Sequence, residues 1–421
     1  MSVRIFHTSV APFVQQAARA LQEAGQLDRL VVALRDDRRS PAQQIVRAIG
    51  RIAGRDMSKE FLRRAVTEVP LDKVETHPFW EWLRLGSREV DRGGRVTDLV
   101  WEKGELAFDR KVARGLQRGL TGVYGYEHSS LATFERARGL GIRTAYEMPS
   151  PEIRFVQRIM DAEMGRFPEL QTDYHRHTAR REGRRTQRRL AEWHLADMVV
   201  VSSTYTKRSF QASGLDPAKV RVIPCGAPPP APRDKALKKS PGGPLQLVCA
   251  GTFSARKGAH YLLDAWRSGG FGRHARLRVF GSVALPERVL RPLPDGVELG
   301  GPIPRPELLQ HFLASDALIF PTLCDGFGMV ATEAWSQGLP VITTDSAGAA
   351  DLVRPGLNGL VIPAGSSSAI AKAIQWCLDH RQELLDMREA ALETAASWQW
   401  GDYRARFAEV LRAEGLFGPS V

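Results

Sequence analysis

The stretch that decides the fold reads Pro321-Thr-Leu-Cys-Asp325-Gly-Phe-Gly328-Met-Val-Ala-Thr-Glu333-Ala-Trp-Ser-Gln-Gly338-Leu-Pro-Val341 and follows the apolar run Ala317-Leu-Ile-Phe320. This order predicts a buried strand, then a glycine loop, then a helix that begins near Met329. Gly326 and Gly328 allow the backbone to pass close to a ligand, where a Cβ atom would obstruct it.

The same stretch places two carboxylates, those of Asp325 and Glu333, on either side of the expected helix start. The first N–H groups of a helix have no partner within the helix and favour anionic oxygens. Two carboxylates that accept hydroxyl hydrogen bonds beside such a turn suit a sugar nucleotide better than a bare phosphate. The alternative is a strand–loop–helix unit of any α/β domain with incidental acids.

Length and composition indicate a two-domain protein without membrane-spanning segments. A chain of 421 residues exceeds one ordinary core, and 43% hydrophobic with 25% charged residues is typical of soluble globular proteins. The sequence contains no run of eighteen apolar residues and opens without the apolar segment of a signal peptide, which predicts a cytoplasmic location. The cysteines never form a Cys-x-x-Cys pair, which argues against a zinc cluster or a disulfide framework.

The net charge of +12 is partly concentrated in seven arginines between Arg176 and Arg189. On a helix these positions form two adjacent i, i+4 rows and hence one basic stripe. Such a stripe favours anionic lipid headgroups or phosphates and predicts peripheral binding at the inner face of the plasma membrane. The alternative is a solvated face with acidic partners inside the chain. Nucleic acid is not expected, because no aromatic residues are interleaved with the arginines.

Strand-like apolar runs alternate with longer helical patterns in both halves, which predicts parallel sheets with helices on both faces. The segment 226–243 is rich in proline, glycine and lysine and is expected to connect two domains. We therefore predict a first domain over residues 1–225 and a second over 244–396, with residues 397–421 as a terminal helix.

The stretch from Asp325 to Glu333 resembles the carboxylate-x7-carboxylate signature of retaining glycosyltransferases of family four (glycosyl transferases group 1), which have the GT-B fold. The resemblance extends from about residue 196 to the C-terminus, is weak before residue 140, and includes motifs at 338–342, 348–353 and 358–363. It implies two Rossmann-like, doubly wound parallel-sheet domains that face a central cleft. It also implies that the C-terminal helix crosses back to the first domain.

The resemblance implies transfer of a sugar, with retention and without a metal ion or cofactor, from a UDP-, GDP- or ADP-sugar. The acceptor would be a hydroxyl of a saccharide or lipid-linked molecule in the synthesis of a bacterial polysaccharide or other glycan. The alternatives are a GT-B sugar-nucleotide epimerase or phosphorylase, and a non-enzymatic binder of anionic surfaces. Phosphorylases of this fold need a pyridoxal phosphate lysine segment, which we do not find, and epimerases lack the Asp325-to-Glu333 pattern in this form.

A second motif, Gly251-Thr-Phe-Ser-Ala-Arg256-Lys257-Gly258, follows the first strand of the second half and suits a diphosphate cradle. It resembles the family's Gly-Arg-x-x-x-x-Lys-Gly motif, although Thr252 stands at the arginine position and Arg256 is the candidate replacement. By resemblance, Asp325 orients the transferred sugar, Lys257 and Arg256 stabilise the leaving diphosphate, and Glu333 takes the ribose hydroxyls. Further expected substrate contacts are Gly251, Thr252, Gly281, Pro302, Ile303, Gly326, Phe327, Gly328 and Met329.

The acceptor side carries less information. His128 follows a strand-like run and is the candidate for the histidine that many relatives place near the sugar and the leaving phosphate, with Glu127 as its competitor. Trp80 and Trp82 are expected in the core, stacked on an acceptor sugar or at a membrane interface. Asp351 is expected to cap the helix that follows it.

Overall fold

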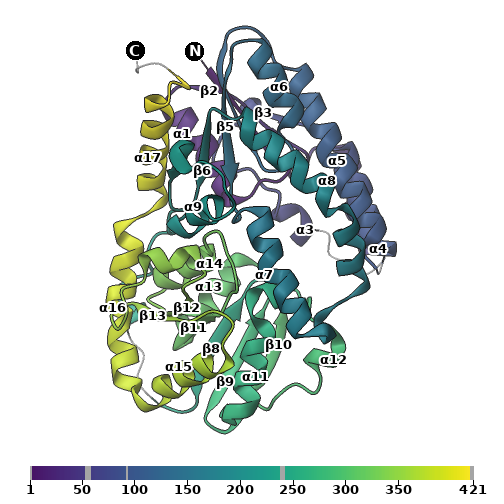
Figure 1. Ribbon diagram of the computed structural model, residues 1–421. Coiled ribbons are helices and arrows are strands. Elements are labelled where there is room, and N and C mark those ends of the chain that lie inside the picture. The colour runs from purple at the N-terminus through teal and green to yellow at the C-terminus, as the bar shows by residue number, and fades with distance from the viewer. Residues whose placement is uncertain (1, 53–57, 92, 238–241, 418–421) are drawn as a thin grey trace.

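The computed structural model describes residues 2–52, 58–91, 93–237 and 242–417 (Figure 1). Its N-terminal half contains a parallel sheet of seven strands in the order β3-β2-β1-β4-β5-β6-β7. The strands are β1 (Ser2–Phe6), β2 (Leu27–Val32), β3 (Val74–Thr76), β4 (Leu120–Tyr126), β5 (Arg143–Met148), β6 (Met198–Val201) and β7 (Val220–Val222). The helices of this half of the chain are α1 (Pro12–Glu23), α2 (Pro41–Ile52), α3 (Ser58–Leu62), α4 (Phe79–Val90), α5 (Arg95–Arg114), α6 (Leu131–Gly139), α7 (Ile153–Arg166), α8 (Asp173–Leu195) and α9 (Thr204–Gln211).

The C-terminal half contains a parallel sheet of six strands in the order β10-β9-β8-β11-β12-β13. The strands are β8 (Leu245–Ala250), β9 (Ala275–Phe280), β10 (Val297–Gly301), β11 (Ala317–Phe320), β12 (Val341–Thr344) and β13 (Gly359–Ile362). The helices are α10 (Arg233–Ala236), α11 (Ala259–Gly269), α12 (Glu287–Leu290), α13 (Arg305–Ala314), α14 (Met329–Ser336), α15 (Ser367–Asp379), α16 (Arg381–Ser397) and α17 (Trp400–Ala413).

Both sheets reverse their strand order at one point, between β1 and β4 in the first and between β8 and β11 in the second. In open α/β sheets, ligands bind outside the carboxyl ends of the strands at such a reversal. The loops that follow these four strands are therefore the places where a substrate is expected, and the glycine loop after β11 is one of them.

The last helix, α17, returns to the N-terminal half and packs beside α1 (Figure 1). Tyr403 and Phe407 are buried in the same apolar cluster as Val3 and Ile5 of β1. The Arg404 guanidinium donates to Gln16 (2.7 Å) and to the Glu23 carboxylate (2.8 Å) on α1. The predicted crossing of the C-terminal helix is thus confirmed, and it holds the two halves together by apolar burial as well as ion pairs.

A second crossing was not predicted from the sequence. Helix α7 and the 3₁₀ turn Pro168–Leu170 belong to the N-terminal half of the chain but pack against the core of the second sheet. Glu163 of α7 accepts a hydrogen bond from His260 of α11 at 2.9 Å, and Leu170 is fully buried in the second core. The domain boundaries predicted from the sequence stay a prediction, because this segment contacts both halves.

Candidate active site

The glycine loop after β11 has the predicted form, since α14 begins at Met329 directly after Gly328. Gly328 has a φ of +86°, which favours glycine, and a Cβ atom there would lie 2.5 Å from the Phe320 ring. Phe327 is buried, and its backbone N–H donates to the Asp325 carboxylate at 3.2 Å. The loop is therefore fixed by its own residues and by the strand that precedes it.

Asp325 is 8% exposed and is held on both sides by the loop after β12. Its N–H donates to the carbonyl of Ser346 (3.0 Å), and its carbonyl accepts from the N–H of Gly348 (3.0 Å). Its carboxylate forms an ion pair with Lys257, which comes from the loop after β8. Two residues 68 positions apart in the sequence thus meet where β8 and β11 end.

Lys257 ends a 3₁₀ turn and is followed by Gly258, whose φ is +69°. A Cβ atom on Gly258 would lie 1.9 Å from the carbonyl oxygen of Pro321, so only glycine allows this approach of the two loops. Burial, and secondarily the nearby Arg256 charge, lower the pKa of Lys257 to about 7. The ion pair with Asp325 acts in the opposite direction, because a neighbouring anion favours the charged ammonium.

Arg256 is tied to the same loop as Asp325. Its guanidinium donates to the carbonyl of Cys324 at 3.0 Å, and its own carbonyl accepts from the N–H of Leu323 at 2.9 Å. Thr252, at the position where the family has arginine, is exposed and accepts a 3.5 Å hydrogen bond from Ser282. Arg256 therefore lies beside the Asp325 loop, and its replacement of the family arginine stays a prediction.

Glu333 lies in α14, where burial raises the pKa of its carboxyl group. Its partner in the structure is Arg305 at the start of α13, at 2.9 Å. The Arg305 side chain is much more exposed than that of Glu333, so it can leave the pair without disrupting a core. The carboxylate expected to bind ribose hydroxyls is thus covered by a movable cation.

The remaining expected donor contacts lie at the carboxyl ends of β8, β9 and β10. Gly281 has a φ of +137°, and a Cβ atom there would lie 1.9 Å from the carbonyl oxygen of Gly251. Gly281 also donates from its N–H to Gly301 at 2.8 Å. Pro302 is exposed and Ile303 is half-buried at the end of β10. These residues form one continuous edge of the second sheet together with Lys257 and the β11 loop.

Gly326 is the point where the donor loop contacts the N-terminal half. A Cβ atom on it would lie 1.9 Å from the carbonyl oxygen of Pro149, in the loop after β5. Its own carbonyl accepts hydrogen bonds from Ser203 Oγ (2.6 Å) and Thr206 Oγ1 (3.0 Å) at the start of α9. The Asp325 loop is therefore positioned by both halves of the chain.

Asp351 also bridges the halves, and the expectation for it was wrong. Its carboxylate accepts from the N–H of Thr204 (2.7 Å) and from the Thr204 hydroxyl (2.6 Å). It therefore caps α9 of the first half and not the helix that follows it in sequence, because the fold brings α9 closer.

Residues 244–380, which include all of these donor-side residues, match the family model of glycosyl transferases group 1. The matched stretch is thus similar to glycosyl transferases group 1 and lies in the second half of the chain. The family predicted from the Asp325-to-Glu333 stretch is thus confirmed for the second half of the chain.

Curated relatives also match parts of the chain. A GDP-mannose-dependent alpha-(1-6)-phosphatidylinositol monomannoside mannosyltransferase of Mycobacterium tuberculosis is 28% identical over 245 residues, covering 52% of this chain and 62% of the relative. A D-inositol 3-phosphate glycosyltransferase of Thermobispora bispora is 32% identical over 116 residues, covering 28% of this chain and 27% of the relative. Each match thus spans less than two thirds of the curated relative.

Solved structures cover nearly the whole chain. Sucrose-phosphate synthase of Thermosynechococcus elongatus has a TM-score of 0.68 at 18% identity, with 98% of each chain covered. Anabaena HepE in complex with UDP has a TM-score of 0.61 at 17% identity, with 98% of this chain and 100% of the other covered. These likenesses, together with the two parallel sheets, confirm the GT-B fold.

His128 follows β4 with a φ of +75° and is only 2% exposed. Its ring stacks on Trp101 at 5.1 Å, and Trp101 lines the cavity beside the end of β1. Burial, reinforced by three neighbouring arginines, lowers the pKa of His128 to about 2, so the ring is neutral. Neither ring nitrogen has a hydrogen-bond partner among the described residues. The competitor Glu127 lines the cavity and accepts from Arg189 at 2.9 Å.

The sequence did not single out the polar groups that line the cavity beside β1. Glu105 of α5 accepts from the Thr8 hydroxyl at 2.8 Å, and burial raises its pKa to about 7. Glu81 and Arg84 of α4 pair at 2.6 Å beside it. No local pattern marks these acids, because α4 and α5 are both rich in charged residues, and only the fold shows which of them point inward.

The arginine stripe on α8 is largely an internal ion-pair network. Five of its seven arginines have acidic partners, which are Asp173, Glu102, Asp98, Asp109, Glu192 and Glu127. Arg180 and Arg184 are exposed and form no ion pair with the residues that the structure describes. Two of the seven arginines are thus left without an acidic partner among the described residues.

Within the described ranges, no three His, Cys, Asp or Glu side chains are grouped so that they could hold a metal ion. The helices of the same residues include none that is long and apolar enough to cross a membrane.

Proposed function

We propose that the protein is a retaining glycosyltransferase. It would move a sugar from a nucleotide diphosphate-sugar to a hydroxyl group of a saccharide or lipid-linked acceptor. The observation that carries the proposal is the contact of Lys257 with Asp325 at the end of β8 and β11, beside the N-terminus of α14. A cation, a hydroxyl-accepting carboxylate and free helix N–H groups are the parts that a sugar diphosphate needs.

In this proposal the sugar hydroxyls bind to the Asp325 carboxylate, which frees Lys257 to contact the diphosphate. Lys257 and Arg256 then stabilise the charge that develops as the bond between the sugar and the diphosphate breaks. The acceptor oxygen forms its bond to the sugar on the same face, and its proton passes to the departing phosphate oxygen. Contacts from both halves around Gly326 would hold donor and acceptor together and exclude water.

The Glu333 carboxylate would accept hydrogen bonds from the ribose hydroxyls after Arg305 moves away from it. His128 would act through Trp101 and not by touching the substrate, because its ring is buried against that indole. The two relatives point to different nucleotides, since one is named for GDP-mannose and HepE was solved with UDP. The exposed Arg180 and Arg184 would add a weak attraction to an anionic membrane surface.

The proposal is tested by incubating the full chain with UDP-, GDP- and ADP-sugars and measuring nucleoside diphosphate release. Wild-type protein is expected to hydrolyse or transfer at least one donor, and Asp325→Asn is expected to lose this activity. Asp379→Asn, an exposed position on α15, serves as the matched control. Release that requires inorganic phosphate would favour a phosphorylase, an epimerised sugar would favour an epimerase, and no turnover of any donor would favour a binder.

A further inference from the structure

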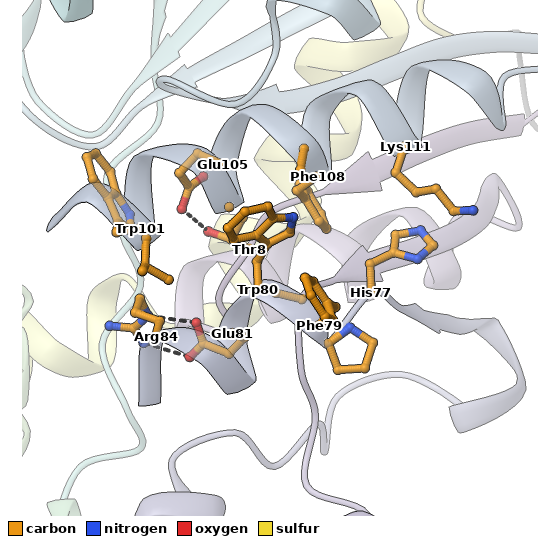
Figure 2. Close-up of a pocket in the computed structure, with 15 residues that line it drawn as sticks. Thr8, His77, Phe79, Trp80, Glu81, Arg84, Trp101, Glu105, Phe108 and Lys111 are labelled. Carbon is orange, nitrogen blue, oxygen red and sulfur yellow. Dashed lines mark hydrogen bonds and ion pairs between the residues drawn. The ribbon is translucent and has the colours of Figure 1, made fainter. Parts of the chain in front are cut away.

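Helices α4 and α5 enclose a cavity of about 330 Å³ beside the first sheet (Figure 2). Its lining includes apolar side chains from both helices, which are Phe79, Trp80, Val100, Ala107 and Phe108. A hydrocarbon placed against these side chains would gain free energy by leaving water.

Gly104 helps to shape this cavity from the interior of α5. Glycine weakens a helix interior relative to alanine, so its presence there needs a reason. A Cβ atom on Gly104 would lie 3.1 Å from the Cβ atom of Trp80. The glycine therefore allows Trp80 to lie close against α5 while its indole borders the cavity.

One end of the cavity adjoins the polar cavity beside the end of β1. Five residues line both, namely Thr8, Glu81, Arg84, Trp101 and Glu105. The hydrogen bond from Thr8 to Glu105 and the ion pair of Glu81 with Arg84 mark this shared wall in Figure 2. The polar cavity also contains His7 and Glu127, at the ends of β1 and β4 where the first sheet reverses its order.

The outer side carries exposed apolar groups. Phe79, which lines the cavity, is 65% exposed, and Leu83 one turn further along α4 is 45% exposed. Such a pair at the edge of a cavity allows a chain longer than the cavity to continue along an apolar surface. The polar wall, the apolar lining and the exposed Phe79 and Leu83 therefore match the order of groups in an amphiphile. His77 and Lys111 also line the cavity near Phe79.

We propose that the α4–α5 cavity binds the hydrocarbon chain of the acceptor, whose hydroxyl-bearing head lies in the adjoining polar cavity. This inference rests on the proposed function and narrows its acceptor class to lipid-like molecules. The two cavities are continuous, so one amphiphilic molecule can place its polar head beside β1 and its hydrocarbon chain between α4 and α5. An apolar side chain of a second protein copy would fill only the α4–α5 cavity.

The test compares binding of n-octyl and n-butyl β-D-glucoside to the full chain by isothermal titration calorimetry, below the micelle concentration. Each buried methylene is expected to tighten binding about fourfold, the equivalent of about 0.8 kcal/mol. The octyl compound should therefore bind at least tenfold more tightly than the butyl compound.

Two variants test the location. Ala107→Phe and Val100→Phe fill the cavity from α5 and should weaken octyl binding at least tenfold, with butyl binding unchanged. Arg110→Phe adds the same ring at an exposed position of α5 that does not line the cavity, and it is the matched control. Thermal unfolding by circular dichroism shows whether each variant is folded. The ratio of octyl to butyl binding by the wild type tests the inference even if no variant folds.

Equal binding of the two glucosides by wild type, or full octyl binding by both folded phenylalanine variants, would overturn the inference. Association of wild-type copies that Ala107→Phe abolishes would also overturn it in favour of a self-contact. Donor turnover with no chain-length effect leaves the proposed function standing while the inference fails. Octyl binding without turnover of any sugar nucleotide would overturn the proposed function and the acceptor assignment with it.

Discussion

Replacing Lys257 with methionine tests the ion pair at the centre of the donor site. The substitution keeps most of the side-chain volume but leaves the Asp325 carboxylate without its cationic partner. Breaking a fully buried ion pair in this way costs about 3–5 kcal/mol. Here the two side chains retain 19% and 12% exposure, so we expect a smaller loss of about 2 kcal/mol in the free energy of unfolding.

Urea unfolding followed by circular dichroism measures this loss, with the exposed Lys372→Met on α15 as the matched control. The double variant Lys257→Met/Asp325→Asn removes both charges and should recover about 1 kcal/mol relative to the sum of the single losses. Lys257→Met should also slow donor turnover by about 10²–10³, the usual effect of losing one preorganised charge-stabilising group. Unchanged stability together with additive single losses would refute the ion pair.

Three further predictions concern Gly326, Glu105 and Arg185. Gly326→Ala places a Cβ atom against the Pro149 carbonyl, so it should cost about 1–3 kcal/mol in urea unfolding and slow turnover, and a wild-type-like variant would contradict the contact. Because the pKa of Glu105 is raised, the folded state keeps a proton that the unfolded state releases between about pH 4.5 and 7, so stability falls as pH rises through this window. Glu105→Gln should remove about 3 kcal/mol of that fall. A difference in unfolding free energy between pH 5 and pH 8 that is the same in the variant and the wild type would contradict it. Arg185→Ala should destabilise the protein by about 2–3 kcal/mol, because Asp98 and Glu102 each lose one of the cationic side chains that they contact. Arg180→Ala should change thermal unfolding little, and equal effects of the two variants would refute the network.

The local parts of the donor site were predictable because they depend on neighbours in sequence. The order of apolar strand, glycine loop and helix start at Met329 follows from the residues between Ala317 and Glu333. The crossing of α17 followed from the family resemblance. The ion pair of Asp325 with Lys257 and the close approach of Gly326 to Pro149 were not predictable. Lys257 and Pro149 come from distant loops that only the packed sheets bring together.

The arginine stripe shows the same limit on α8. Its helical periodicity was visible in the sequence, but the acids that neutralise Arg185 come from α5, about eighty positions earlier. The α4–α5 cavity was equally hidden. The sequence left open whether Trp80 and Trp82 pack in the core; in the structure Trp82 packs against Phe61, while Trp80 borders the cavity.

We propose that this site transfers a sugar from a nucleotide diphosphate-sugar with retention of the anomeric configuration. Proton NMR of the anomeric hydrogen in the first product formed, from whichever donor is turned over, tests it most directly. We predict that the product has the same anomeric configuration as the donor. A product of inverted configuration would contradict the same-face reaction assigned to Asp325, Lys257 and the departing phosphate.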